Sequence, residues 1–455
     1  MACSKNMRRR ILLLPLLLAA GLSGQTLQQM QVPQIPFVEF KLSNGLRVIL
    51  SQDYSLPLVT ESMLFASPPL PPQAAARTAA RLMFAGSAHA PGSAFTRLLA
   101  AYGGTGGVTV RPGYTYFHET VPSNALEAVM WLDADRLASL APPSPPGQQQ
   151  IQLYAQEARL RVANTPYGPL LHGAVQQQAW GWPVAPATPD LGAARTWAHE
   201  YFTPRNCILT IVGAFEAAQV KPLVQKYFGW IPSGGPLPPL PAAAPAQSRP
   251  ASAPRSETLR DPMAHLPALS IAWQGPPRGS RDYYALAMLS RLLFAGHGAA
   301  LYQSLVADHQ VALTVTGGLG YPFDSYRGYQ SPGLFGAFVI FKPGTAPALI
   351  QGLVMQQIHQ LEATGVSQTA LRRWQAMLES EWIASGQTTL GRNRMLALSA
   401  LLDGKPGAVN AEIGHFLNVT SDDLEHAAQT YLIGARANVI VDVPAPPAPA
   451  TPGGH

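Results

Sequence analysis

Two arginines, Arg77 and Arg81, have the spacing at which pairs of side chains commonly hold a metal ion. The segment 73–84 is rich in alanine and ends in Leu-Met-Phe, which predicts a helix. On a helix these two positions lie one turn apart on the same face. Histidines at this spacing, with a glutamate beside them, bind zinc and activate water. Arginine offers no lone pair and keeps its proton, and the position of the base is Ala80.

Other histidines and carboxylates are candidates for a rebuilt metal site. His89 follows a Gly-Ser turn, and His118 precedes Glu119 in a strand-like run, where alternation sends neighbouring side chains to opposite faces. His199 and Glu200 form a pair without a second histidine at helical spacing. These patterns do not predict a working replacement site. The expected cofactor complement is therefore none, with zinc held by other ligands kept as an alternative.

Several further chemistries are not predicted. The glycine cluster 103–107 is not followed by the Lys-Ser/Thr of a phosphate-binding loop. Cys207 lies in the apolar run 206–212 and is expected to be a small buried hydrophobe. Nucleic-acid binding is not expected, because four of the six excess positive charges lie in residues 1–24 and the rest of the chain has no basic tract.

Residues 1–24 have the pattern of a secretory signal peptide. Lys5 and Arg8–Arg10 precede the apolar run 11–20, and small residues follow at Gly21, Ser23 and Gly24. The apolar run is too short for a membrane span, so no span is expected in the mature chain. The pattern predicts a secreted protein, located in the periplasm.

The remaining chain is expected to form two domains. Residues 232–256 are rich in Pro, Ala and Ser, a composition typical of a linker, and residues 444–455 resemble a low-complexity tail. This leaves domains at 37–231 and 257–443. Each opens with strand-like runs, continues into Ala/Leu-rich helices and closes with an apolar β run, which suggests an internal duplication.

Several short motifs along the chain carry a resemblance to a known family. The motifs are Asn44-Gly-Leu-Arg-Val48, Phe84-Ala-Gly-Ser87, the stretch 115–127, Trp131-Leu-Asp-Ala-Asp-Arg136, the stretch 157–168 and Tyr201-Phe-Thr-Pro-Arg-Asn206. Residues 275–284 and Leu301-Tyr302 add matches in the second half. With these motifs the chain resembles the pitrilysin/insulinase family of zinc metallopeptidases, and most of all its periplasmic bacterial members.

The resemblance implies that the family's zinc motif is degenerate in this chain. That motif, His-x-x-Glu-His, precedes the Phe-x-Gly-Ser turn, and its positions are held by Arg77, Ala80 and Arg81. The third ligand of the family corresponds to Glu157. Catalytic zinc needs about three protein ligands, so we expect neither metal binding nor a catalytic residue. Glu157 is instead expected to pair with the two arginines.

Two other positions of the family have changed. The family's Gly-Gly-x-x-Asn-Ala segment, an edge for substrate pairing, corresponds to residues 103–108, with Gly107 in place of the Asn and Val108 after it. The second-domain pattern Ser-Arg-Leu-Tyr corresponds to residues 299–302, which keep Tyr302 but have Ala300 for the arginine. The resemblance thus makes Gly107, Val108 and Tyr302 candidate peptide contacts.

The resemblance also implies a fold and a role. Each half is expected to be an α+β domain, a mostly antiparallel sheet with helices packed on one face. The expected protein is a catalytically inactive metallopeptidase homologue that binds peptide or supports an active partner peptidase of the same family in a hetero-oligomer. Two alternatives stay open: a free-standing peptide-binding homo-oligomer, and a residual zinc metalloendopeptidase with non-standard ligands.

Overall fold

A computed structural model describes most of the chain from residue 34 onward. The described residues are 34–68, 74–140, 149, 152–153, 156, 160, 164–180, 191–238, 255–323, 325–330 and 333–446. The expected signal peptide, most of the expected linker, the tail beyond residue 446 and Glu157 lie outside them. The expected domain boundaries stay predictions.

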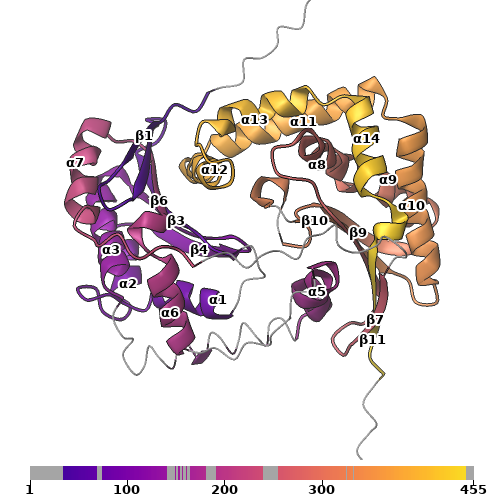
Figure 1. Ribbon diagram of the computed structural model, residues 1–455, viewed down its shortest axis with the longest axis horizontal. Coiled ribbons are helices and arrows are strands. Elements are labelled where there is room, and N and C mark those ends of the chain that lie inside the picture. Colours follow the sequence, from indigo (N-terminus) through magenta and orange to yellow (C-terminus); the bar gives the residue numbers. More distant parts are fainter. Residues whose placement is uncertain are drawn as a thin grey trace, which may run out of the picture. The chain divides into compact units, whose positions relative to one another are not determined.

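Six strands of the first half form one mixed sheet (Figure 1). Its order is β1-β2-β6-β3-β5-β4, and every pairing is antiparallel except that of β2 with β6. The strands are β1 (Val38–Lys41), β2 (Arg47–Gln52), β3 (Leu58–Ala66), β4 (Thr105–Arg111), β5 (Tyr114–Pro122) and β6 (Cys207–Gly213).

The second half repeats this topology without the first strand. Its order is β7-β11-β8-β10-β9, again with one parallel pairing, that of β7 with β11. The strands are β7 (Arg255–Asp261), β8 (Ala268–Gln274), β9 (Ala312–Leu319), β10 (Leu334–Phe341) and β11 (Asn438–Pro444). Strand for strand, β7-β11-β8-β10-β9 matches β2-β6-β3-β5-β4, which confirms two homologous halves of the α+β class.

Both halves of the chain contain several helices. In the first half they are α1 (Ala74–Leu82), α2 (Ala94–Ala101), α3 (Leu126–Ala138), α5 (Val175–Trp180), α6 (Leu191–Tyr201) and α7 (Ala217–Phe228). In the second half they are α8 (Arg281–Phe294), α9 (Ala300–Tyr302), α10 (Pro347–Thr364), α11 (Gln368–Gly386), α12 (Thr389–Leu402), α13 (Ala408–Leu417) and α14 (Ser421–Tyr431). Short 3-10 and π turns are η1 (Ser123–Ala125), η2 (Leu170–Ala174), η3 (Pro204–Asn206), η5 (Gln303–Asp308), η6 (Tyr326–Gly328) and η7 (Gly434–Arg436).

The expected packing of helices on one face of each sheet is only part of the observed arrangement. Each half also places one helix on the sheet of the other half. Helix α12 packs on β3 and β6 of the first sheet, and α5 with η2 packs on β8 and β11 of the second (Figure 1). Alternate residues of β3 explain this: Val59, Met63 and Phe65 enter the core of the first half, while Thr60 and Ser62 face α12. The two halves are therefore joined by a reciprocal exchange.

Local sequence chemistry starts several elements. Asn44 accepts a hydrogen bond from the Leu46 amide and donates to the carbonyls of Phe228 and Ile231, while Gly45 takes φ +94°. The expected turn before β2 is thereby observed. The helix expected over 73–84 is α1, followed by a turn in which Gly86 has φ +126° and a Cβ would lie 2.4 Å from the Gly92 nitrogen. Within the described residues, no helix is long and apolar enough to cross a membrane.

Candidate functional site

Helix α1 carries the arginine pair that the sequence analysis singled out. Arg77 and Arg81 are half-buried and lie one turn apart. Ala80 is 1% exposed and belongs to the apolar core of the first half. Its methyl group has no proton chemistry, and guanidinium groups do not bind zinc. Ala80 thus contributes to core packing.

A histidine that the sequence did not indicate lies near this arginine pair. His172 is in η2, and its ring centroid is 5.7 Å from that of Phe323. Burial lowers the pKa of His172, and the positive charges of Arg77 and of Arg111 at the end of β4 lower it further. Near neutral pH the imidazole of His172 is therefore mostly neutral, although the arginines near it are charged. No local pattern marks it, since α1, β4 and η2 are far apart in the chain.

The candidate replacement ligands do not converge. His89 is exposed and its Nδ1 lies 2.6 Å from Asp135 Oδ1. His118 and Glu119 point to opposite faces of β5, as their alternation predicts, and His199 and Glu200 are exposed on α6. Among the described residues, no group of three His, Cys, Asp or Glu side chains could hold a metal ion. Glu157 is not among those residues, so its pairing with the arginines stays a prediction.

Strand β4 forms one end of the first sheet and contains Gly107 and Val108. It pairs with β5, with Gly107 opposite His118 and Val108 opposite Phe117. The terminal strand of a sheet presents backbone N–H and C=O groups to which an extended peptide can add. A Cβ at position 107 would lie 3.2 Å from Cε1 of His118, so this glycine lets the imidazole lie over the strand.

Helix α12 packs on β3 and β6 of the same sheet and is held there by Asn393. The Asn393 amide is fully buried and donates to the carbonyls of Thr60, at 3.0 Å, and Thr210, at 2.7 Å. Its oxygen accepts hydrogen bonds from the Ser62 and Tyr116 hydroxyls at 2.6 and 2.8 Å. All four hydrogen-bonding positions of the amide are used, which fixes the register of α12 on the sheet.

The next residue, Arg394, is thereby placed within electrostatic range of Tyr116 and His118 on β5. The rings of Tyr116 and His118 stack with centroids 5.4 Å apart. Burial lowers the pKa of His118, and the charges of Arg394 and Arg136 lower it further. Arg394 itself is exposed and makes no hydrogen bond or ion pair within the described part of the chain. Its charge is therefore available to a ligand at this edge.

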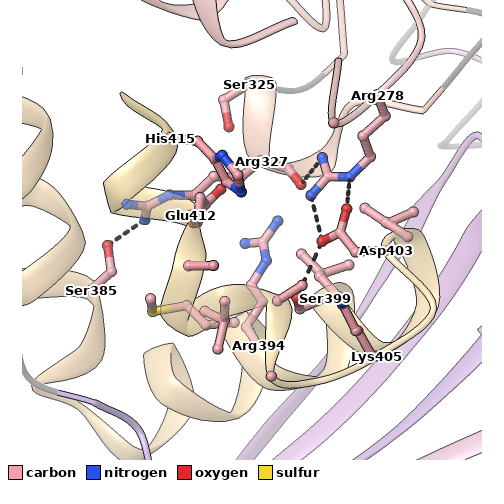
Figure 2. A pocket seen from close by; sticks show the side chains of 18 of the residues that line it. Arg278, Ser325, Arg327, Ser385, Arg394, Ser399, Asp403, Lys405, Glu412 and His415 are labelled. Carbon is pink, nitrogen blue, oxygen red and sulfur yellow. Dashed lines mark hydrogen bonds and ion pairs between the residues drawn. The ribbon is translucent and has the colours of Figure 1, made fainter. Parts of the chain in front are cut away.

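Arg394 also lines a cavity of the second half, which has a volume of about 1030 Å³ (Figure 2). Figure 2 shows its guanidinium pointing into the cavity between Glu412 and Asp403. The ionisable side chains of the lining are Arg278, Arg327, Arg394, Lys405, Asp403, Glu412 and His415, with Tyr284 also present and Ser325, Ser385 and Ser399 as hydroxyl groups.

Two of these cations have protein hydrogen-bond partners. Arg278 pairs with Asp403 through Nε at 2.8 Å and Nη2 at 3.2 Å, and its Nη1 donates to the carbonyls of Tyr326, Arg327 and Tyr329. Arg327 donates to the Ser385 hydroxyl, and its Nη2 is buried without a hydrogen-bond partner among the described residues. Burial raises the pKa of Glu412 despite the charges of Arg327 and Arg278.

A separate buried charge cluster lies on the opposite face of the first sheet. Arg136 contacts Glu119 at 2.7 Å and Asp133 at 2.8 Å, and Glu61 lies directly across from Glu119 in the β3–β5 register. Burial raises the pKa values of all three carboxyls. Phe84, Phe95 and Phe117 surround the guanidinium at 4.4–5.1 Å from their ring centroids. With side chains almost fully enclosed, this cluster is a structural element.

The last candidate contact, Tyr302, belongs to the second half. It ends α9, which packs against α8, α10 and β9. Its ring stacks on that of His297 with centroids 4.6 Å apart. The structure thus places Arg77, Ala80 and Arg81 on α1, Gly107 and Val108 on β4, and Tyr302 on α9. Their roles stay predictions.

Comparisons with known proteins agree with this architecture. Residues 190–378 match the family model described as the Peptidase M16 inactive domain. A protease from Helicobacter pylori has a TM-score of 0.80 at 18% sequence identity, covering 90% of this chain and 100% of that chain. None of the curated proteins compared with the chain matches it.

Two further solved structures share the fold. A peptidase M16 inactive domain from Pseudomonas fluorescens has a TM-score of 0.75 at 14% identity, covering 90% of this chain and 98% of that one. A putative M16-like peptidase from Alicyclobacillus acidocaldarius has a TM-score of 0.70 at 15% identity, covering 91% and 100%. At these identities the likeness concerns the fold.

Proposed function

We propose that the chain is a non-catalytic homologue of the M16 peptidases, the pitrilysin/insulinase family, and that it binds peptide along β4 and supports an active partner peptidase. The observation that carries the proposal is the arginine pair of α1. The resemblance aligns Arg77 and Arg81 with the zinc-binding histidines of the family, and Ala80, aligned with the glutamate, is buried in the core. Neither a metal ligand nor a base remains on this helix.

Peptide binding is supported by the position of β4. It is the last strand of its sheet, and an added peptide strand would continue the β5–β4 pairing outward. Backbone hydrogen bonds of this kind do not depend on a metal ion. A homologue that has lost its catalytic residues therefore keeps a means of holding an extended chain.

The first experiment tests the absence of catalysis. The purified protein is analysed for zinc by mass spectrometry and incubated with fluorogenic peptides. We expect zinc well below one ion per chain and intact peptides. Stoichiometric zinc together with hydrolysis that a chelator stops would instead favour the alternative of a residual metallopeptidase with other ligands.

The second experiment tests peptide binding at β4. Labelled extended peptides of about ten residues are titrated by fluorescence anisotropy, and each peptide nitrogen is methylated in turn. Strand addition uses alternate N–H groups of the peptide, so methylation should weaken binding at every second position. Binding that is insensitive to methylation, or no binding, contradicts the proposal.

The partner is proposed to be an M16 peptidase with an intact His-x-x-Glu-His motif. Affinity purification from the native periplasm, followed by mass spectrometry, should recover such a protein in stoichiometric amount. Self-association alone in sedimentation experiments would favour the free-standing peptide-binding homo-oligomer. We also propose a periplasmic location from the pattern of residues 1–24, which N-terminal sequencing of the mature protein would test by locating the cleavage site.

A further inference from the structure

We infer that the cavity of the second half is an acidic-peptide subsite, in which Arg394, Lys405 and Arg327 bind carboxylates of the peptide held at β4. This inference rests on the proposed function and names its ligand class. The carboxylates come from Asp or Glu side chains or from the peptide's C-terminus. The argument depends on the charges of the cavity, their partners and the position of Arg394.

The cavity has an excess of positive charge that its own acidic residues do not match. Asp403 is paired with Arg278, and this pair is held by backbone carbonyls. Arg394 and Lys405 are exposed and make no side-chain hydrogen bond or ion pair within the described ranges. The remaining acidic side chain, Glu412, lies near both Arg327 and Arg278, and the lining has four Arg and Lys side chains against two carboxyl groups.

One buried donor of the cavity also needs an acceptor. Arg327 Nη1 donates to Ser385 and its Nε to the Tyr326 hydroxyl at 3.1 Å. Its Nη2 is buried and has no acceptor among the described residues. An unpaired buried donor is costly, and a carboxylate oxygen satisfies a guanidinium better than a neutral acceptor does.

Arg394 connects the cavity with the strand edge. Through its neighbour Asn393 it is fixed on the β3–β5 face, close to the stacked rings of Tyr116 and His118. The His118 ring in turn lies over Gly107 of β4. The same guanidinium points into the cavity (Figure 2). An extended peptide on β4 can therefore direct acidic side chains to Arg394 and onward to the other cations.

The size of the cavity favours a peptide over a small anion. A volume of about 1030 Å³ is at the upper end of ordinary ligand pockets and exceeds that of a single phosphate many times. The cations come from separate elements. Arg278 lies just before α8, and Arg327 lies in η6. Arg394 lies in α12, and Lys405 follows that helix. Such a spread suits several carboxylates along one chain.

The test compares three labelled peptides of identical length. One has Glu at every second position, and the other two have Gln or Lys at the same positions. Each has a form with a free C-terminus and an amidated form. We expect the Glu peptide to bind about tenfold or more tightly than the Gln peptide, with the Lys peptide weakest and the preference shrinking as salt is added. Amidation reveals whether the terminal carboxylate contributes.

Variants locate the preference in the cavity. Arg394→Gln and Lys405→Gln should each reduce the ratio of Glu-peptide to Gln-peptide affinity, and the double variant should reduce it most. Both side chains are exposed, so the fold should be retained. The matched control is Arg372→Gln, an exposed arginine of α11 outside the cavity lining, which should leave the ratio unchanged.

The outcomes separate this inference from the proposed function. Equal binding of Glu and Gln peptides with the alternating methylation pattern overturns the acidic subsite and leaves peptide binding at β4 intact. An acidic preference that survives the double variant also overturns the subsite. Inorganic phosphate that displaces the Glu peptide at concentrations that leave the Gln peptide bound supports an anion site. Failure of every peptide to bind overturns both proposals.

Discussion

The Asn393 oxygen accepts a hydrogen bond of 2.6 Å from the Ser62 hydroxyl, although 331 residues separate the two positions. This contact joins α12 of the second half to β3 of the first. The Asn393 amide group also donates to Thr60 and Thr210 and accepts from Tyr116. One fully buried side chain thus links two halves that have separate sheets, and it sets the position of the neighbouring Arg394.

Asn393→Ala should therefore destabilise the protein strongly. The truncation leaves two buried hydroxyls and two carbonyls without this partner, and each buried unsatisfied group costs about 1–3 kcal/mol. We expect the free energy of unfolding in urea to fall by at least about 3 kcal/mol. Asn418→Ala, at an exposed amide after α13, is the control and should change it little. A similar small loss in both variants would contradict the linking role of Asn393.

The buried carboxyl of Glu61 should make stability fall as pH rises. It faces Asp133, Glu119 and Arg136, and burial is the main cause that raises its pKa in the folded state. Between the ordinary glutamate pKa and the raised one, the folded protein binds the extra proton, so folding becomes less favourable with increasing pH. The stabilising contribution is complete below the unfolded pKa and is lost through the folded one.

Glu61→Gln removes this titration. The stability curves of variant and parent, measured by urea unfolding from about pH 4 to pH 8, should lie closest at the acidic end. They should then diverge, with the variant more stable at the alkaline end. Parallel curves would mean that Glu61 is not protonated in the folded protein at the lower pH values.

Arg136 should be one of the most sensitive positions of the first half. It is 1% exposed, contacts Glu119 and Asp133, and lies among aromatic rings. Arg136→Met leaves carboxyl groups without their cation, and breaking one side of a buried pair costs about 3–5 kcal/mol. Arg97→Met, at an exposed arginine of α2, is the matched control.

A second variant separates charge from packing at this cluster. If the loss in Arg136→Met arises from unpaired carboxyls, adding Glu119→Gln and Asp133→Asn should recover part of the stability. Unfolding free energies of the single and triple variants in urea give the comparison. No recovery would assign the loss to contacts of the guanidinium with the phenylalanine rings.

Restoring the family's motif should return metal binding more readily than turnover. The variant combines Arg77→His, Ala80→Glu and Arg81→His, with Glu157 as the third ligand implied by the resemblance. We expect zinc to rise toward stoichiometric amounts with little hydrolysis, because Gly107 and Ala300 leave substrate positioning impaired. Zinc analysis and fluorogenic peptides measure the two effects.

The same variant should lose stability, which is a consequence of the structure. Ala80 is buried in the apolar core, so a glutamate there must displace packed atoms or remain partly desolvated. A lower melting temperature without zinc, recovered by added zinc, is expected. Rapid hydrolysis by this variant would show that substrate positioning is intact.

Local patterns in the sequence determined much of this protein. The Asn44-Gly45 turn, the helix around Arg77 and Arg81 and the opposite faces of His118 and Glu119 follow from short-range chemistry and side-chain periodicity. The α+β class and the repeat of two homologous halves followed from strand and helix runs together with the resemblance. The structure confirms these, and strand order adds the duplication in detail.

Only the tertiary structure decided which distant residues meet. The exchange of α5 and α12, the Asn393 contacts, the approach of His172 to Arg77 and Arg111, and the cavity around Arg394 each combine segments far apart in sequence. Sequence periodicity indicates which face of a strand or helix is apolar. It does not indicate which half of the chain supplies the helix that packs on that face. The physical reason is that both faces of central strands such as β3, β6 and β8 are buried, so either half could supply the covering helix until packing selected one.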